Sequence, residues 1–141
     1  MIPMRSQFDC TMTIQNAHQL KGKTGIRRLI NATRYSRDGI VAAFKNEAAF
    51  RQEAVCCLFL IPAAFVLPIE TIYKLAAIGS LFLLLIVELL NSGIEAAIDR
   101  IGPELHEKSK VAKDVGSAAV LFALTHAVVV WVCVLIQAFV L

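Results

Sequence analysis

The sequence predicts an all-α membrane protein in which an amphipathic surface helix precedes three transmembrane helices. Hydrophobic residues make up 57% of its 141 residues, above the roughly 45–50% that is typical of soluble domains, and the mean hydropathy is +0.67. Three apolar stretches, which with their flanking residues can supply the ~20 residues that cross a bilayer, are separated by polar segments. A chain of this length is one domain at most, and a net charge of only +3 gives little support for a nucleic-acid partner.

An N-terminal extension is expected over residues 1–24, where polar residues without a period predict disorder. The membrane domain follows over residues 25–141. It begins with a surface helix at about 25–44, in which arginines flank an apolar face. The apolar face consists of Ile26, Leu29, Ile30, Thr33, Ile40, Val41 and Phe44. The flanking arginines are Arg27, Arg28, Arg34 and Arg37.

Three spans are expected, at about 48–67, 72–100 and 113–141. Pro68 ends the first of them, and the Gly102–Pro103 pair ends the second. Because the second stretch is longer than a bilayer requires, its last turns should emerge into water. A charged connector over residues 104–114 then leads into the third span.

The basic residues predict the topology of these spans. They gather before the first span and in the connector between the second and third, whereas the turn between the first two holds Lys74 against Glu70. By the positive-inside rule, the N-terminus and the second connector face the cytoplasm. The C-terminus then lies on the opposite side of the membrane.

One face of the second span carries most of its polar groups. Residues three, four and seven apart share a face of a helix. The polar stripe defined in this way consists of Glu88, Asn91, Ser92, Glu95 and Asp99. Glu88 follows an uncharged run, Ile78–Val87, and an acid near the hydrocarbon costs roughly 2–3 kcal/mol. Such a cost is tolerated for function or for tight pairing.

Polar groups of the other two spans fall on the same side of the membrane as this stripe. Glu47 stands at the start of the first span, and Lys113, Asp114 and Ser117 stand at the start of the third. Carboxylates from two helices can hold Mg²⁺ beside nucleotide phosphates. A buried carboxylate such as Glu88 is a candidate proton acceptor, and a lysine can neutralise phosphate charge.

The same acids also have structural and transport interpretations. Glu47 with Arg51, and Glu95 with Asp99 and Arg100, could form pairs that only orient the spans, as in a membrane scaffold. Alternatively, the acids could line the path of a small ion transporter or channel subunit. Such a path favours acids spread through the depth of the bilayer, whereas here they gather at one side.

Four segments closely resemble the prokaryotic diacylglycerol kinase family: Asn46–Glu53, Glu88–Glu95, Asp99–Ile101 and Ala112–Val120. They occur in the family's order and at its separations, and the resemblance covers about residues 25–141. The Glu-x-x-Asn-Ser-x-Ile-Glu run in the second segment lies within a membrane helix and is highly specific. The short members of the family have no counterpart of residues 1–24.

The resemblance implies a homotrimeric bundle in the bacterial inner membrane, with active sites built between protomers. It implies Mg²⁺-dependent phosphorylation of 1,2-diacyl-sn-glycerol by ATP to give phosphatidic acid, in support of phospholipid recycling. Related proteins of Gram-positive bacteria use undecaprenol, which is the alternative substrate. The segments Asn46–Glu53 and Ile98–Ile101 look more like the diacylglycerol type.

The resemblance also implies roles for individual residues. Glu88 would be the catalytic base, and Asn91 would support the site. Glu47 and Glu95 would bind the metal. The residues implied for ATP binding are Arg28, Tyr35, Glu47, Glu95, Glu104, His106, Lys113 and Asp114. Those implied for the lipid substrate are Arg28, Glu88 and Ser117.

Overall fold

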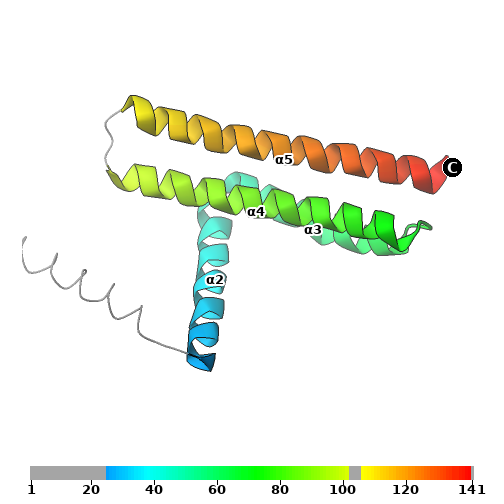
Figure 1. Ribbon diagram of the computed structural model, residues 1–141, viewed down its shortest axis with the longest axis horizontal. Helices are drawn as coiled ribbons and strands as arrows, with labels where there is room; N and C mark the ends of the chain where they lie inside the picture. The colour runs from blue at the N-terminus through cyan, green and yellow to red at the C-terminus, as the bar shows by residue number, and fades with distance from the viewer. Residues whose placement is uncertain (1–24, 102–105, 141) are drawn as a thin grey trace, which may run out of the picture. The chain divides into compact units, whose positions relative to one another are not determined.

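The computed structural model describes residues 25–101 and 106–140. In this part of the chain all regular structure is helical, as the sequence predicts (Figure 1). The helices are α2 (Ile26–Asn46), α3 (Ala48–Val66), α4 (Thr71–Ile101) and α5 (Glu107–Phe139). The last three are long and apolar enough to cross a membrane, in agreement with the expectation of a multi-pass membrane protein. The predicted extension over residues 1–24, and Glu104, lie outside the described residues.

Helix α2 begins after Gly25 and ends at Asn46, past the predicted end at residue 44. Gly25 has a φ of +72°, a left-handed conformation that glycine adopts without strain because it has no Cβ. The chain divides at Gly39 into two compact units, and all three spans belong to the second unit. In the first unit, the apolar side chains of Ile26 and Leu29 are exposed.

Helix α3 follows α2 after a single residue, Glu47, and Arg51 holds this junction together. Nη1 of Arg51 donates to the backbone carbonyl oxygens of Phe44 at 3.2 Å and of Lys45 at 2.9 Å. These carbonyls belong to the last turn of α2, where no further helical amide is available to them. The arginine therefore satisfies the end of one helix from the first turn of the next.

The turn between α3 and α4 is short: a residue before a proline ends α3, and a lysine of α4 hydrogen-bonds to the last turn of α3. Leu67 has an extended backbone, the conformation that a following proline favours, so α3 ends at Val66 just before Pro68. From the first turn of α4, Lys74 Nζ donates to the carbonyl oxygen of Phe65 at 3.0 Å. This hydrogen bond satisfies a carbonyl in the last turn of α3, where a cation is also favoured by the helix dipole.

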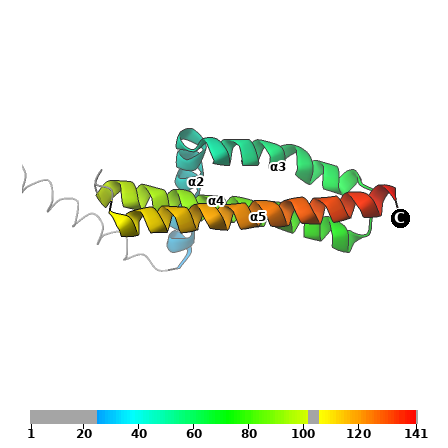
Figure 2. The same ribbon diagram turned by 90° about the horizontal axis from the view of Figure 1, so that it is seen from above.

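Helix α4 is the central span, and it packs against both α3 and α5. Figures 1 and 2 show α4 and α5 side by side and antiparallel, so that the end of α4 lies beside the start of α5. Figure 1 also shows this helix pair extending past the first turn of α3. The last turns of α4 thus lie beyond the start of the first span, in agreement with the length of α4.

Small residues make part of the contacts between the spans. Ala64 of α3 and Ala77 of α4 are fully buried, and they form one cluster with Val134 of α5. Large apolar side chains point outward instead, for example Phe59 and Phe122. In lipid, helices associate through close van der Waals packing rather than through the hydrophobic effect, so small residues at the contacts are favourable.

Enlarging one of these contacts is expected to destabilise the chain. Ala64→Leu should lower the free energy of unfolding by about 1–3 kcal/mol, because the added side chain must be forced into a packed interface. Its neighbour Ala63 is exposed, and Ala63→Leu should change the same quantity by less than about 0.5 kcal/mol. The measurement is the unfolding midpoint in detergent mixtures of rising SDS fraction. Equal effects of the two substitutions would contradict the packing of Ala64.

Helix α5 begins at Glu107, well before the predicted start of the third span at residue 113. His106 caps the helix, because its Nδ1 accepts the backbone amide of Lys108 at 3.2 Å. Glu107 then places an acid in the first turn, where it complements the helix dipole. Most of the predicted charged connector is therefore helical, since local capping stabilises the helix outside the apolar stretch.

Candidate functional site

One face of α4 changes from apolar to polar along its length. Leu81 and Leu84 are buried on this face, and the next residue along it is Glu88, which is only 4% exposed. Beyond Glu88 the face continues with the half-buried members of the predicted polar stripe, Asn91, Ser92 and Glu95. Leu90 and Ile94 face outward instead, 63% and 41% exposed. In the stretch Glu88–Glu95, the polar side chains Glu88, Asn91 and Glu95 therefore face inward, whereas Leu90 and Ile94 face outward.

Four carboxylates, two on α4, one on α3 and one at the N-cap of α3, interact in pairs through their charges: Glu88, Glu95, Glu53 and Glu47. The charges of Glu95 and Glu47 act on Glu88, and the charge of Glu88 acts on Glu53. Glu47 is the N-cap of α3 but makes no side-chain capping hydrogen bond. In the part of the chain that the structure describes, neither Glu47 nor Glu95 forms an ion pair. Within these residues, no ion pair neutralises either carboxylate.

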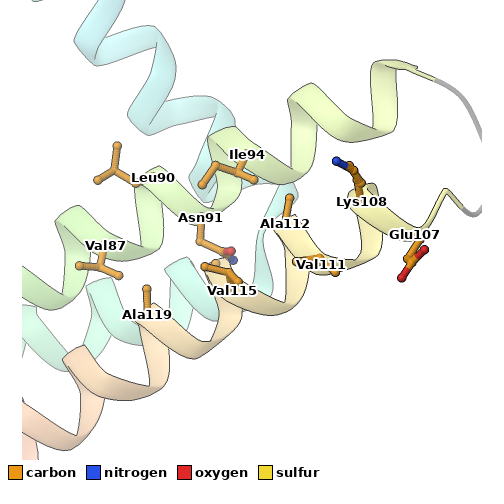
Figure 3. Close-up of a pocket in the computed structure, with 11 residues that line it drawn as sticks. Val87, Leu90, Asn91, Ile94, Glu107, Lys108, Val111, Ala112, Val115 and Ala119 are labelled. Carbon is orange, nitrogen blue, oxygen red and sulfur yellow. The ribbon is translucent and has the colours of Figure 1, made fainter.

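Asn91 orients one of these carboxylates. Its Nδ2 donates to Oε1 of Glu95, one turn further along α4, at 3.0 Å. Its Oδ1 is buried and has no hydrogen-bond partner among residues 25–101 and 106–140. Figure 3 shows the side chain directed from α4 toward α5. The carboxamide thus links the polar stripe of α4 to the neighbouring helix.

Helix α5 brings a cation to the polar stripe. Lys113 Nζ donates to Oδ1 of Asp99 at 2.5 Å, forming an ion pair between α5 and α4, and it also interacts with the charge of Glu95. The next residue, Asp114, pairs with Lys110 one turn earlier at 2.5 Å. Both ion pairs are exposed to solvent and add little to stability.

An apolar cavity of about 530 Å³ lies between α3, α4 and α5. Its walls include Leu84 and Val120, and its polar residues include Glu53 and Trp131. Glu53 Oε2 and Trp131 Nε1 are both buried without a hydrogen-bond partner among the described residues. Ser117 precedes Val120 by one turn of α5 and so lies on the same side of the helix. The cavity therefore combines apolar walls with a free acceptor and a free donor.

A second groove, of about 950 Å³, runs between α4 and α5 (Figure 3). Its walls are mostly apolar and include Val87, Val115 and Ala119. Asn91 of the polar stripe also lines it, and Lys108 stands toward the charged start of α5 (Figure 3). The groove thus leads from the apolar part of the two spans to their charged ends.

The sequence is similar to enzymes of one family. The family model for prokaryotic diacylglycerol kinase matches residues 34–135. A diacylglycerol kinase of Pseudomonas aeruginosa is 50% identical over 116 residues, which are 82% of this chain and 94% of the relative. A diacylglycerol kinase of Escherichia coli K12 is 51% identical over 113 residues, 80% and 92% of the two chains. The chain belongs to the prokaryotic diacylglycerol kinase family.

More distant members of the family show the same match. A diacylglycerol kinase of Helicobacter pylori is 41% identical over 107 residues, which are 76% of this chain and 84% of the relative. The range matched by the family model contains Tyr35, the four carboxylates, Asn91 and Lys113, whereas Arg28 precedes it. The matched range therefore includes the polar groups that α3, α4 and α5 contribute to the candidate site.

Several other residues implied for the kinase family belong to the first compact unit, cap α5 or lie outside the described residues. Arg28 and Tyr35 are exposed residues of α2 in the first compact unit. His106 uses its Nδ1 to cap α5, which leaves Nε2 for other interactions. Glu104 lies outside the described residues. The second unit by itself thus unites Glu47, Glu88, Asn91 and Glu95 with Lys113.

Sequence reasoning did not single out Glu53, which this family member places beside Glu88. Glu53 lies three residues after Phe50 and four before Cys57, both of which are buried. These spacings put all three side chains on one face of α3. The spacing of Glu53 from these two apolar residues therefore indicates that its carboxylate faces inward. The argument from helical spacing that identified the polar stripe of α4 would have found Glu53 if it had been applied to α3.

Proposed function

We propose that the chain transfers the γ-phosphate of ATP to the free hydroxyl of 1,2-diacyl-sn-glycerol, giving phosphatidic acid and ADP. Its relatives bear the name diacylglycerol kinase and match most of the chain. The observation that carries the proposal is the burial of Glu88, which is 4% exposed within a span. It lies one turn beyond Leu84, which lines the apolar cavity. A buried acid at this level is costly, and proton transfer from a lipid hydroxyl gives it a use.

In the proposed mechanism, Glu88 accepts the proton of the lipid hydroxyl. The lipid oxygen forms a bond to the γ-phosphorus while the bond from that phosphorus to the β,γ-bridging oxygen breaks, and ADP leaves with the bonding electrons. Lys113 neutralises part of the negative charge on the phosphates. Glu88 stands where the face of α4 changes from apolar to polar, so it can meet a lipid from the bilayer and a nucleotide from water.

Glu47 and Glu95 are the proposed ligands of the Mg²⁺ ion that accompanies ATP. Among residues 25–101 and 106–140, no three His, Cys, Asp or Glu side chains form a set that could hold a metal by themselves. Two carboxylates nevertheless suit Mg²⁺, which is commonly held by one or two carboxylates together with substrate phosphates and water. When bound, the ion would neutralise phosphate charge. Asn91 supports this assignment because it orients the Glu95 carboxylate.

The nucleotide is proposed to bind at the cytoplasmic ends of α4 and α5. Lys113 stands close enough to Glu95 for their charges to interact, so the cation and the metal ligand can act on the same phosphates. The family resemblance adds further residues that would hold ATP. These are Arg28, Tyr35, Glu104, His106 and Asp114.

The lipid is proposed to enter the cavity between the three spans from the side, within the bilayer. The apolar walls suit acyl chains, which then never leave an apolar environment. Glu53 Oε2 and Trp131 Nε1 can pair with the hydroxyl and ester groups of the glycerol part. Ser117 and Arg28 would add polar contacts to the lipid, as the resemblance implies.

The chain is proposed to lie in the bacterial inner membrane with its N-terminus and the α4–α5 connection in the cytoplasm and its C-terminus in the periplasm. The distribution of Lys and Arg supports this orientation. In the same proposal α2 lies in the membrane surface and three copies form a trimer that shares its active sites. The large apolar side chains on the outer faces, such as Phe59 and Leu121, support contact with lipid or with further copies.

Phosphate transfer in mixed micelles tests the proposed activity. The purified full-length chain is offered diacylglycerol and undecaprenol separately, with ATP and Mg²⁺. Phosphatidic acid is expected to form much faster than undecaprenyl phosphate, and only when Mg²⁺ is present. Transfer of phosphate to undecaprenol alone would support the proposed kinase site but would identify undecaprenol, not diacylglycerol, as the substrate. A folded chain that transfers phosphate to neither lipid would refute the kinase proposal. A measurement of ion flux in proteoliposomes would then test the transporter alternative.

A further inference from the structure

Gly116 of α5 lacks a side chain at a point where Asn91 of α4 takes up the available space. A Cβ atom on Gly116 would collide with Oδ1 of Asn91 and would lie 3.4 Å from its Cγ. Gly116 is itself buried. A Cβ on Gly79 or Gly93 of α4, in contrast, would meet nothing within 4 Å. Among the described glycines of the spans, Gly116 is therefore the one whose missing side chain makes room for a polar group of the site.

The position of the Asn91 oxygen decides where its nitrogen points. The carboxamide is planar, with the oxygen against Gly116 and Nδ2 donating to Glu95 Oε1 at 3.0 Å. If the oxygen is pushed away from α5, the whole group must turn and the hydrogen bond to Glu95 is strained or lost. The backbone of α5 is thus coupled to the orientation of a carboxylate on α4.

A second contact holds the two helices together on the other side of Glu95. Lys113 lies three residues before Gly116, on the same face of α5, and pairs with Asp99. Asn91 precedes Glu95 by one turn of α4, and Asp99 follows it by one turn. Glu95 therefore lies between two contacts of α4 with α5. Asn91 contacts Gly116 on one side of it, and Asp99 pairs with Lys113 on the other.

We propose that Gly116 is a positioning residue of the kinase site: it admits the Asn91 carboxamide between α4 and α5 so that Asn91 can hold the Glu95 carboxylate for the metal–nucleotide complex. The proposal rests on the proposed function, because it takes Glu95 as a ligand of Mg²⁺. Gly116 touches neither substrate and acts through Asn91. Partners that orient a metal ligand in this way commonly affect metal affinity as much as 10–100-fold.

A simpler role for Gly116 would be to let the helix backbones approach closely, as small residues do in membrane proteins. The two roles predict different responses to a shorter side chain at position 91. If the added methyl group collides with Asn91, then Asn91→Ser relieves the collision. If it collides only with the close packing of the helices, the shorter side chain brings no relief.

The experiment compares Gly116→Ala with Gly93→Ala, a matched control on the facing helix with open space around the new methyl group. The NMR signals of the Asn91 side-chain amide are recorded in the metal-free full-length chain and are assigned by their loss in Asn91→Ser. We expect these signals to shift in Gly116→Ala and to keep their chemical shifts in Gly93→Ala. In the kinase assay, Gly116→Ala should raise the half-saturating Mg²⁺ concentration about tenfold or more while the KM for diacylglycerol is unchanged. The thermal midpoint of Gly116→Ala/Asn91→Ser should equal that of Asn91→Ser.

The outcomes separate the proposal from its alternatives. Unmoved Asn91 amide signals in Gly116→Ala, or a loss of stability that persists with serine at position 91, would overturn it and leave a packing glycine. A raised KM for the lipid at an unchanged Mg²⁺ requirement would overturn it as well. A wild-type chain without kinase activity would instead refute the proposed function, and the NMR and stability measurements would still decide whether Gly116 positions Asn91.

Discussion

Replacing Glu88 by glutamine is expected to slow phosphate transfer to diacylglycerol by about 10²–10⁴-fold, the contribution that is typical of a general base. Glutamine has nearly the same shape but cannot take the proton of the lipid hydroxyl. Glu88 is buried near the charges of Glu95 and Glu47, and a neutral amide avoids the cost of burying a charge there. The variant should therefore keep or raise its thermal midpoint. Initial rates and thermal unfolding of the same preparation provide the two measurements.

The control for this substitution is Glu70→Gln. Glu70 is an exposed acid in the turn between α3 and α4, at the opposite end of the spans from the polar stripe, and its replacement should leave the rate unchanged. If Glu88→Gln changed only the stability of the chain and not the rate, Glu88 would be a structural acid, as the scaffold alternative requires.

Replacing Glu95 by glutamine is expected to raise the Mg²⁺ concentration needed for half-maximal activity by at least about 10–100-fold, the loss seen when even an outer partner of a metal ligand is removed. The substitution takes away a negative charge and one oxygen. The remaining carboxamide oxygen of the variant can still accept the hydrogen bond that Asn91 Nδ2 now donates to Oε1 of Glu95. The chain should consequently keep its fold. A titration of Mg²⁺ at saturating ATP and diacylglycerol gives the value.

Glu88→Gln serves as the comparison for Glu95→Gln in that titration. A variant that lacks the base should be slow at every Mg²⁺ concentration, whereas the defect of Glu95→Gln should shrink as Mg²⁺ rises. An unchanged half-saturating concentration in Glu95→Gln would remove Glu95 from the metal site and reopen the interpretation in which it only orients the spans.

Features that depend on a local period were predictable from the sequence. The burial of Glu88 follows from the uncharged run before it and from its place on the face of Leu81 and Leu84. The inward direction of Asn91 and Glu95 follows from their helical spacing to Glu88. The end of α3 was predictable because Pro68 forces an extended residue before it.

Features that depend on contacts between separate helices were not predictable. The spacing of residues along α4 says nothing about which residue of α5 lies opposite, so neither the ion pair between Asp99 and Lys113 nor the contact of Asn91 with Gly116 could be read from it. The early start of α5 was missed for another reason. The capping hydrogen bond of His106 stabilises a helix in a charged segment that hydropathy alone treats as a connector.

The change from apolar to polar along one face of α4 also has a consequence for which lipids can react. At 1.5 Å per residue, Glu88 lies about 25 Å along the helix from Thr71, close to the ~30 Å thickness of the hydrocarbon layer. In the proposed mechanism and topology, the length of this part of α4 sets the height in the bilayer of Glu88, the proposed base. A lipid whose hydroxyl lies at that depth in the bilayer can contact Glu88 whatever the length of its acyl chains. A hydroxyl that lies nearer to the water, among the headgroups, cannot. The membrane itself would then sort substrates by depth before any side chain recognises their shape.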